Sequence, residues 1–564
     1  MLLPIRDRKR PGHLAGVHRL ADSPPAASSR NRTIAIASAI WGASIFLSRI
    51  IGLVREQIVG RTLGASREAD LYFASFTLPD FLNYLLAAGA LSIVFIPIFL
   101  EHLQKGDADG GWRAFSVIAN FIAVIGTLGI VLMMVFARPL AGIVAPGFTE
   151  AGEIDTLVRL MRIILPAQFF HIVGGLLSAT LQAQDRHALP ATAPLVYSVG
   201  IIIGGLLGAT FGWGADGFAW GVLVGSIVGP FGLPLYGCLR HGMRWHPTLS
   251  FRNPDLGRYL FLSLPIMLGF SIVLVDQWII KNQASFLPAG DLSYLQYART
   301  LMNVPIGVFG MALGVASYPT LSRTVASGRI DEAYGVLVHA VRLMLVATFA
   351  AEVAITLAGF EAVYLIWGAF ASRFTLADAA ATATVLSFMS IGLCGWAAQT
   401  LIGRGFYALG STWMPTIIGT IATVVLIPLY VVLRQQAGAV GLAIASSVAI
   451  LAYVLVLGFL QRRRFEREAR ARGQELPTQS GMLDGAVRAG AAAAIAIAAG
   501  LAFRTVLVEW LPGLGIGVVL LRGAVLSIAG IALYAVLARL FGLKELAEVT
   551  ARITSRLKRR RKAA

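Results

Sequence analysis

The sequence predicts an all-α polytopic membrane protein with about 14 transmembrane helices, arranged as two parallel-repeat lobes of six helices and two extra C-terminal helices. Three observations lead to this fold class. Of the 564 residues, 57% are hydrophobic and only 13% are charged. The apolar residues form runs of roughly 20, the length that crosses about 30 Å of hydrocarbon as a helix. Residues in the first half of the chain also match residues in the second half at a fixed offset. Since every backbone polar group must be paired internally in lipid, such runs indicate helices and not strands.

The predicted spans follow one another with short polar, Gly-rich or Pro-rich connections. They lie near residues 33–54, 70–100, 112–137, 156–183, 189–212, 215–238, 258–281, 292–320, 334–358, 378–403, 412–433, 437–461, 483–507 and 513–541. Residues 1–32 are basic and contain no apolar stretch typical of a cleavable signal peptide, so we expect a disordered tail there.

Basic residues indicate the orientation. The loop after the sixth span contains Arg240, Arg244, Arg252 and Arg258, the loop after the twelfth contains six arginines between positions 462 and 472, and the C-terminal tail is basic at 558–562. An even number of spans places both tails and these loops on one side, which the positive-inside rule identifies as the cytoplasmic side. Arg61 and Arg67 in the first loop oppose this weakly.

These features divide the chain into seven predicted parts. They are a disordered basic cytoplasmic tail (1–32), an N-terminal transmembrane lobe (33–238), a cytoplasmic linker (239–257), a C-terminal transmembrane lobe (258–461), a basic cytoplasmic loop (462–482), two extra transmembrane helices (483–541) and a basic cytoplasmic tail (542–564).

The two lobes share residues at a fixed offset. Tyr72, Ala90, Leu91 and Pro97 in the second span match Tyr294, Ala312, Leu313 and Pro319 in the eighth. Units six spans apart have the same membrane orientation, so the repeat is parallel, about an axis along the membrane normal. Transporters built in this way bind substrate between the halves and alternate access by rocking one half against the other. Chance similarity among Gly/Ala/Pro-rich helices is the alternative explanation.

The net charge and the cysteine content limit the kinds of partner and cofactor that the chain can have. A net charge of +18 would suggest nucleic acid in a soluble protein, but here the excess lies in tails and loops, where it favours contact with anionic lipid headgroups. Cys238 and Cys394 are far apart in apolar runs, so we expect no disulfide, no metal site and no cofactor.

Charged residues inside predicted spans are the candidate functional residues. Arg49 lies within the first span and Arg55 at its end. An intramembrane Arg costs about 2.5–3.5 kcal/mol on insertion scales and is a functional candidate by default, although Arg55 could also snorkel to the interface. Asp70 begins the second span, either as a partner of these arginines or as an acid at a helix N-terminus. Asp276 lies deep in the seventh span, with an ion-coupling role or a pair with Lys281 as alternatives.

Four motifs occur in order along the membrane region. They are Ser48-Arg49-Ile-Ile-Gly-Leu-Val-Arg55, Leu78-Pro79-Asp80, Pro305-Ile-Gly-Val-Phe-Gly310 and Arg404-Gly-Phe406-Tyr407. With their spacing, they resemble the MurJ/MviN family, which belongs to the superfamily of the MATE exporters and polysaccharide flippases. The resemblance implies a flippase, and not an enzyme, that moves undecaprenyl-pyrophosphate-linked intermediates, usually the peptidoglycan precursor lipid II, by alternating access. It also implies cell-wall synthesis proteins as partners.

A lipid-linked glycan needs a wet cavity, cations for its pyrophosphate and a lateral opening for its tail. By resemblance and position, the residues expected at this cavity are Arg49, Arg55, Asp70, Asn83, Arg299 and Asn303, with Asp276 as the candidate for ion coupling. Arg299 and Asn303 are four residues apart and therefore share a helix face.

The chain departs from the family pattern at several charged positions. Asn83 and Tyr84 occupy the places of an arginine pair, Ala88 that of a glutamate, Thr300 that of an arginine and Asn303 that of an acid. We therefore expect a less cationic cavity. The eleventh span contains no acid between residues 416 and 432, so we expect transport to respond to membrane potential and not to sodium.

Other functions remain open at this point. A flippase for another polyprenyl-linked oligosaccharide, such as an exopolysaccharide or O-antigen unit, has the same requirements. A MATE-type small-molecule antiporter needs an acidic cavity, whereas the first span here carries arginine. A non-transporting scaffold would also tolerate the lost charges. The sequence has no Walker A motif, which argues against ATP hydrolysis by this chain.

Overall fold

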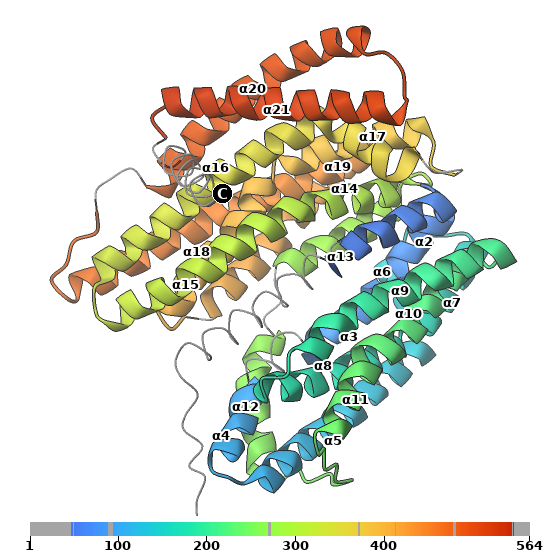
Figure 1. The fold of residues 1–564 in the computed structure, drawn as a ribbon, viewed down its shortest axis with the longest axis vertical. Helices are drawn as coiled ribbons and strands as arrows, with labels where there is room; N and C mark the ends of the chain where they lie inside the picture. Colours follow the sequence, from blue (N-terminus) through green and yellow to red (C-terminus); the bar gives the residue numbers. More distant parts are fainter. Residues whose placement is uncertain are drawn as a thin grey trace, which may run out of the picture.

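The computed structural model describes residues 47–48, 50–87, 94–268, 272–369, 373–411, 413–477, 481–543 and 545. Over these residues all regular elements are helices (Figure 1), so the all-α prediction is confirmed. Arg49, Ala88 and the predicted tail 1–32 lie outside the described residues, as does nearly all of the tail predicted at 542–564.

The helices of the first half begin with a helical stretch at residues 50–63. After it come α2 (Arg67–Ser75), α3 (Thr77–Ala87), α4 (Ile96–Gln104), α5 (Ala108–Val135), α6 (Ala137–Val144), α7 (Ala151–Ile164), α8 (Ala167–Ala183), α9 (Ala188–Phe211), α10 (Ala215–Ser226), the π-helix η2 (Ile227–Gly232) and α11 (Leu233–Arg240). We refer to this group as the N-terminal lobe.

The second half begins with α12 (Pro254–Leu268). It continues through α13 (Ile272–Ala284), α14 (Asp291–Pro305), the π-helix η3 (Ile306–Gly310), α15 (Met311–Ala326), α16 (Ile330–Val363), the π-helix η4 (Tyr364–Gly368), α17 (Leu376–Ser390), α18 (Leu393–Ala408), α19 (Trp413–Arg470), α20 (Met482–Trp510) and α21 (Ile516–Leu540). We refer to α13–α19 as the C-terminal lobe.

Eight helices among the described residues are long and apolar enough to cross a membrane, or nine if α17 and α18, bent by 42°, form one span. One of the eight, α19, is really two helices, because Ala437 and Gly438 leave the helical region and Gly438 has φ +55°. This break falls where the eleventh predicted span gives way to the twelfth. The described residues of the second and eighth predicted spans fall into several elements each, and residues 269–271 of the seventh lie outside the described residues, so the count of about 14 stays a prediction.

Glycines determine the packing of α9 against α10. A Cβ added at Gly204 would lie 2.4 Å from the carbonyl oxygen of Gly217 and 2.6 Å from the Cα of Gly221. Only the absence of side chains lets the two backbones approach so closely. Small residues at such interfaces are the usual means of helix association in lipid, where burial of apolar surface gives no driving force.

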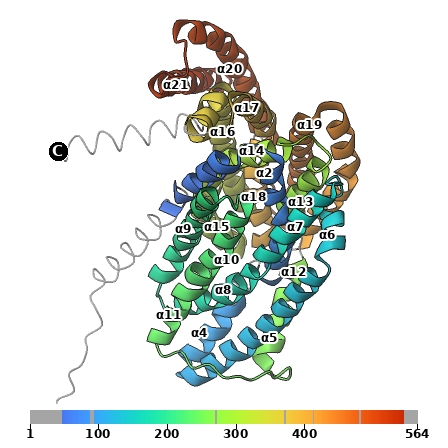
Figure 2. The ribbon, with the colours of Figure 1, turned by 90° about the vertical axis from the view of Figure 1, so that its right-hand side faces the viewer.

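The seventh predicted span divides between the two lobes. Its first half, α12, packs against α3 and α5, whereas its second half, α13, packs mainly against α19. Figure 1 and Figure 2 both show α12 beside α4 and α5 at the lower end of the molecule. The connection at 269–271 lies outside the described residues. The two halves of this predicted span therefore pack on different lobes.

The last two helices, α20 and α21, pack against α16 at the top of the view in Figure 1. A buried ion cluster holds them there: Arg522 donates to Glu361 at 2.8 Å, and Arg504 lies 3.6 Å from the same carboxylate. A buried carboxylate requires such partners because its desolvation is costly.

Candidate functional site

The lobes meet at one end of the molecule through hydrogen bonds between α2 and the start of α14. Asp70 is fully buried and accepts hydrogen bonds from the backbone N–H groups of Gly290 (2.7 Å) and Ser293 (2.9 Å) and from the Ser293 hydroxyl (2.6 Å). The Tyr297 hydroxyl donates to the carbonyl oxygen of Gly64 at 2.8 Å. We call these five residues the gate. Asp70 caps a helix of the other lobe, where free N–H groups and the helix dipole favour a carboxylate.

Contacts beside the gate strengthen the closure. Arg67 donates to the carbonyl oxygen of Leu287 at 3.3 Å and pairs with Glu153 on α7 at 2.8 Å. The indole N–H of Trp367 donates to the carbonyl oxygen of Glu56 at 2.9 Å. Segments more than 200 residues apart in the chain are thus joined at this end by backbone-directed hydrogen bonds, which specify one relative position of the lobes.

A second contact between the lobes lies deeper, between α3 and α13. The Lys281 ammonium lies 3.9 Å from a carboxylate oxygen of Asp80, and the rings of Phe81 and Trp278 are 5.1 Å apart. Lys281 also lines a small cavity of about 10 Å³ together with Gln277, Gln296 and Arg299. The separation of 3.9 Å is long for a charge-assisted hydrogen bond, so this ion pair is loose.

Asp276 and Arg299, two of the predicted site residues, come together inside the C-terminal lobe. The Arg299 guanidinium donates to one carboxylate oxygen of Asp276 and the Tyr430 hydroxyl donates to the other. Arg299 also lies over the ring of Trp396, 5.5 Å from its centroid. Both carboxylate oxygens are therefore occupied, and the cation beside Asp276 is Arg299 and not Lys281. No group of three or more His, Cys, Asp and Glu residues suited to a metal occurs in the described parts of the chain.

The other predicted site residues are more dispersed. Arg55 pairs with its neighbour Glu56 at 2.6 Å, and its side chain remains 28% exposed. Asn83 is half-buried on α3, whereas Asn303 is exposed although it shares α14 with the buried Arg299. Arg49 lies outside the described residues. The structure thus brings Asp276 to Arg299 but gives Asp70 and Arg55 partners other than each other.

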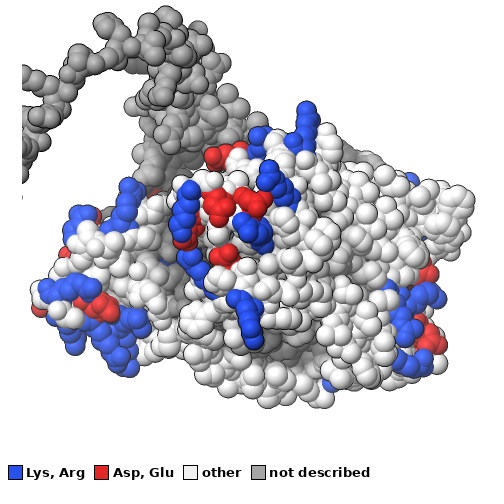
Figure 3. Space-filling view, turned by 90° about the horizontal axis from the view of Figure 1, so that it is seen from below, with Lys and Arg blue, Asp and Glu red and all other residues white. Residues whose placement is uncertain are grey.

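Charged side chains also gather at the end of the molecule opposite the gate. They form separate groups on a surface that is otherwise largely uncharged (Figure 3). Here α4 contacts α12: His102 lies 3.1 Å from Asp255, and Arg258 donates to Glu101 at 2.7 Å. Hydrogen bonds from Lys105 and Arg258 lower the pKa of Glu101, just beyond the second predicted span, to about 2. These ion pairs hold α12 on the N-terminal lobe.

The Asp80–Lys281 contact was not among the predicted site residues. Both residues are charged and lie within predicted spans, which is a signal for function. Their meeting across the lobes depends on how α3 and α13 are rotated, and a single sequence does not specify that rotation. Lys281 is therefore a described cation at a contact between the lobes.

Comparison with known proteins gives consistent matches. The family model described as "Lipid II flippase MurJ" matches residues 59–521. A protein of Thermotoga maritima named "Probable lipid II flippase MurJ" is 30% identical over 425 residues, covering 75% of this chain and 84% of that protein. A protein of Rhizobium tropici with the same name is 27% identical over 419 residues, covering 72% and 77%.

Solved structures agree with the fold. A structure described as "Lipid II flippase MurJ, inward closed conformation" aligns with a TM-score of 0.71 and 21% identity, covering 89% of this chain and 98% of that one. An inward-facing MATE multidrug transporter aligns with a TM-score of 0.64 and 14% identity, covering 75% and 96%. At these identities, the structural matches establish the fold alone.

Proposed function

The chain belongs to the lipid II flippase MurJ family, and we propose that it moves lipid II across the bacterial inner membrane by alternating access between its two lobes. It is a multi-span membrane transporter and not an enzyme. Lipid II carries an anionic pyrophosphate and a large polar head, and neither crosses hydrocarbon without a polar path. Two lobes that close at one end and part at the other would provide such a path.

The gate supports alternating access independently of the family match. Its hydrogen bonds join α2 and the residue Gly64 before it to the start of α14, so these bonds must break when the lobes part at this end. Alternating access requires an element that is formed in one state and lost in the other. Asp70 and its partners on α14 have this property.

We assign the pyrophosphate to two described cations, Lys281 and Arg55, together with Arg49. Lys281 is held only loosely by Asp80 and therefore loses little when it exchanges this carboxylate for a phosphate. Arg55 remains partly exposed and has a guanidinium fork that matches a phosphate. Because the Arg299 guanidinium already donates to Asp276, we assign Arg299 to the stability of the C-terminal lobe and not to the pyrophosphate.

We further propose that both termini face the cytoplasm, which places the gate on the periplasmic side. The basic loops after the sixth and twelfth predicted spans support this orientation. The test is a reporter active only in the periplasm, fused after Ala564. Its inactivity is expected, and its activity would refute the orientation.

We also propose that transport responds to membrane potential and not to sodium. In the described residues, each carboxylate oxygen of Asp276 already accepts a hydrogen bond, one from Arg299 and one from Tyr430, and the Arg299 charge disfavours a second cation beside it. Membrane potential supplies about 2.3 kcal/mol per charge per 100 mV, which can act on the cavity cations as the lobes rock. The test measures flipping in proteoliposomes with potassium replacing sodium, and then with an imposed potassium–valinomycin potential. A strict sodium requirement at fixed potential would contradict the proposal.

Complementation tests the function itself. The wild-type chain is expected to restore growth to a strain depleted of its own lipid II flippase. Lys281→Ala is expected to fail while the protein remains in the membrane, whereas Lys105→Ala, which removes an exposed lysine paired with Glu101, is expected to restore growth. Absence of growth with the wild-type chain present in the membrane would reject lipid II as the substrate.

A further inference from the structure

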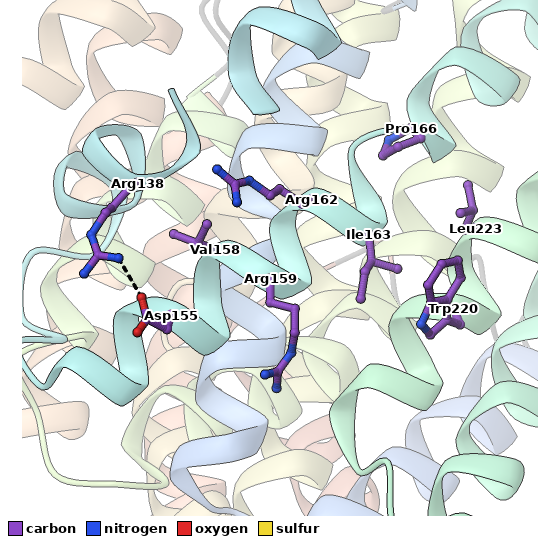
Figure 4. A pocket seen from close by; sticks show the side chains of 9 residues that line it. All are labelled: Arg138, Asp155, Val158, Arg159, Arg162, Ile163, Pro166, Trp220 and Leu223. Carbon is purple, nitrogen blue, oxygen red and sulfur yellow. Dashed lines mark hydrogen bonds and ion pairs between the residues drawn. The ribbon is translucent and has the colours of Figure 1, made fainter. Parts of the chain in front are cut away.

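A cavity of about 400 Å³ opens on the N-terminal lobe, away from the contacts between the lobes. Its lining includes Arg138, Asp155, Arg159 and Arg162, and all of its lining residues belong to α6, α7 or α10, apart from Pro166 just before α8. Figure 4 shows Arg138 and Asp155 at one side and Trp220 and Leu223 at the other, with Arg159 and Arg162 on α7 between them. One wall is thus cationic and the opposite wall is apolar.

The charges around this cavity do not balance. Arg138 pairs with Asp155 at 2.7 Å, and Arg159 pairs with Asp216 at 3.1 Å. Arg162 donates its Nε–H to the carbonyl oxygen of Met134 at 3.1 Å and pairs with no acid among the residues that the structure describes. Three arginines and two acids leave one positive charge. Arg162 is therefore the arginine of this lining whose charge no acid among the described residues balances.

The cavity lies beside surface that contacts lipid. The ends of α5 and α6 expose apolar side chains: Val135 is 64% exposed, Phe136 54% and Ile143 70%. Trp220, on the apolar wall itself, is 50% exposed. In a membrane-spanning protein such side chains face the acyl chains, and tryptophan is enriched at the level of the lipid headgroups. The mixture of arginine and exposed tryptophan therefore indicates the interface between hydrocarbon and water.

We propose that this cavity binds the phosphate headgroup of an anionic membrane phospholipid. The single phosphodiester charge balances the unpaired charge of Arg162, and the guanidinium fork suits phosphate oxygens. The acyl chains lie along Trp220 and Leu223. A zwitterionic lipid would bring a second cationic group next to Arg138 and Arg159, and a soluble anion would leave the apolar wall uncovered. This site is separate from the substrate path, because the C-terminal lobe contributes none of its lining.

The test is native mass spectrometry of the purified full-length chain titrated with phosphatidylglycerol or phosphatidylcholine. The wild-type chain is expected to retain one phosphatidylglycerol about tenfold more tightly than phosphatidylcholine, which corresponds to one charge-assisted hydrogen bond. Arg162→Ala is expected to lose this preference and Arg162→Lys to keep part of it. Arg113→Ala, at an exposed arginine near the opposite end of α5, is the matched control and is expected to behave as the wild type.

Three results would overturn the proposal. The first is an equal preference in Arg162→Ala and Arg113→Ala. The second is equal retention of the two lipids by the wild type. The third is complete displacement of phosphatidylglycerol by excess inorganic phosphate, because the site would then hold a soluble anion. If Arg162→Ala does not fold, Trp220→Ala tests the apolar wall. This variant is expected to bind phosphatidylglycerol more weakly, and inorganic phosphate is expected not to displace the lipid from it.

Discussion

Replacing Asp70 with asparagine should open the gate. The carboxylate accepts three hydrogen bonds from α14 and the residue before it, and asparagine keeps only one acceptor oxygen. Its amide N–H group would then face a backbone N–H. A hydrogen bond to a charged group contributes about 1.5–3 kcal/mol, so the closed arrangement should lose about 2–3 kcal/mol. This corresponds to a decrease of about 30-fold to 150-fold in the ratio of closed to open molecules.

Electron–electron double resonance can measure this shift. Spin labels at Arg61 and Leu376, both exposed and on different lobes, report the separation at the gate without touching it. Cys238 and Cys394 are buried and can be replaced by alanine to leave only the labelled sites. Asp70→Asn should transfer population from the short to the long distance. A distance distribution identical to that of Asp155→Asn, the matched control within a single lobe, would refute the reasoning.

Three further predictions concern single residues or pairs. Arg49→Ala should abolish transport while expression persists, and Arg49→Lys should restore it only in part; flipping at the wild-type rate would reject this assignment. Asp276→Ala should lower the melting temperature of the purified protein, because it leaves the Arg299 charge buried at a cost of about 3–5 kcal/mol, whereas replacing both residues with apolar ones should cost less. Gly204→Val should reduce the yield of folded protein, since its side chain would meet the backbone of α10, while Gly152→Ala, with open space around its Cβ, should not.

The sequence predicts most of the helices and even some of their breaks. The lengths of the apolar runs alone predict spans that lie close to the observed helices α5, α9, α20 and α21. The connection predicted between residues 433 and 437 lies next to Gly438, whose positive φ allows the chain to leave the helix. Helix length and the backbone freedom of glycine depend on nearby residues only, so both can be predicted from a single sequence.

The partners of the charged residues could not be predicted in the same way. Arg299 meets Asp276 only because α13 and α14 have particular rotations, and a change of one residue in register turns a helix by about 100°. Asp70 caps a helix that begins about 220 residues later, and no local pattern encodes this contact. The arginines of the lipid cavity lie on two helices of the N-terminal lobe and become neighbours only in the folded protein.

Reconstituted flipping shows whether this chain moves lipid II between the leaflets. Purified protein in proteoliposomes should move labelled lipid II from one leaflet to the other under an imposed membrane potential, and Lys281→Ala should abolish this movement while Lys105→Ala retains it. An undecaprenyl-pyrophosphate-linked exopolysaccharide unit should move more slowly. If wild-type protein moves the exopolysaccharide unit and leaves lipid II in place, the account is wrong about the substrate.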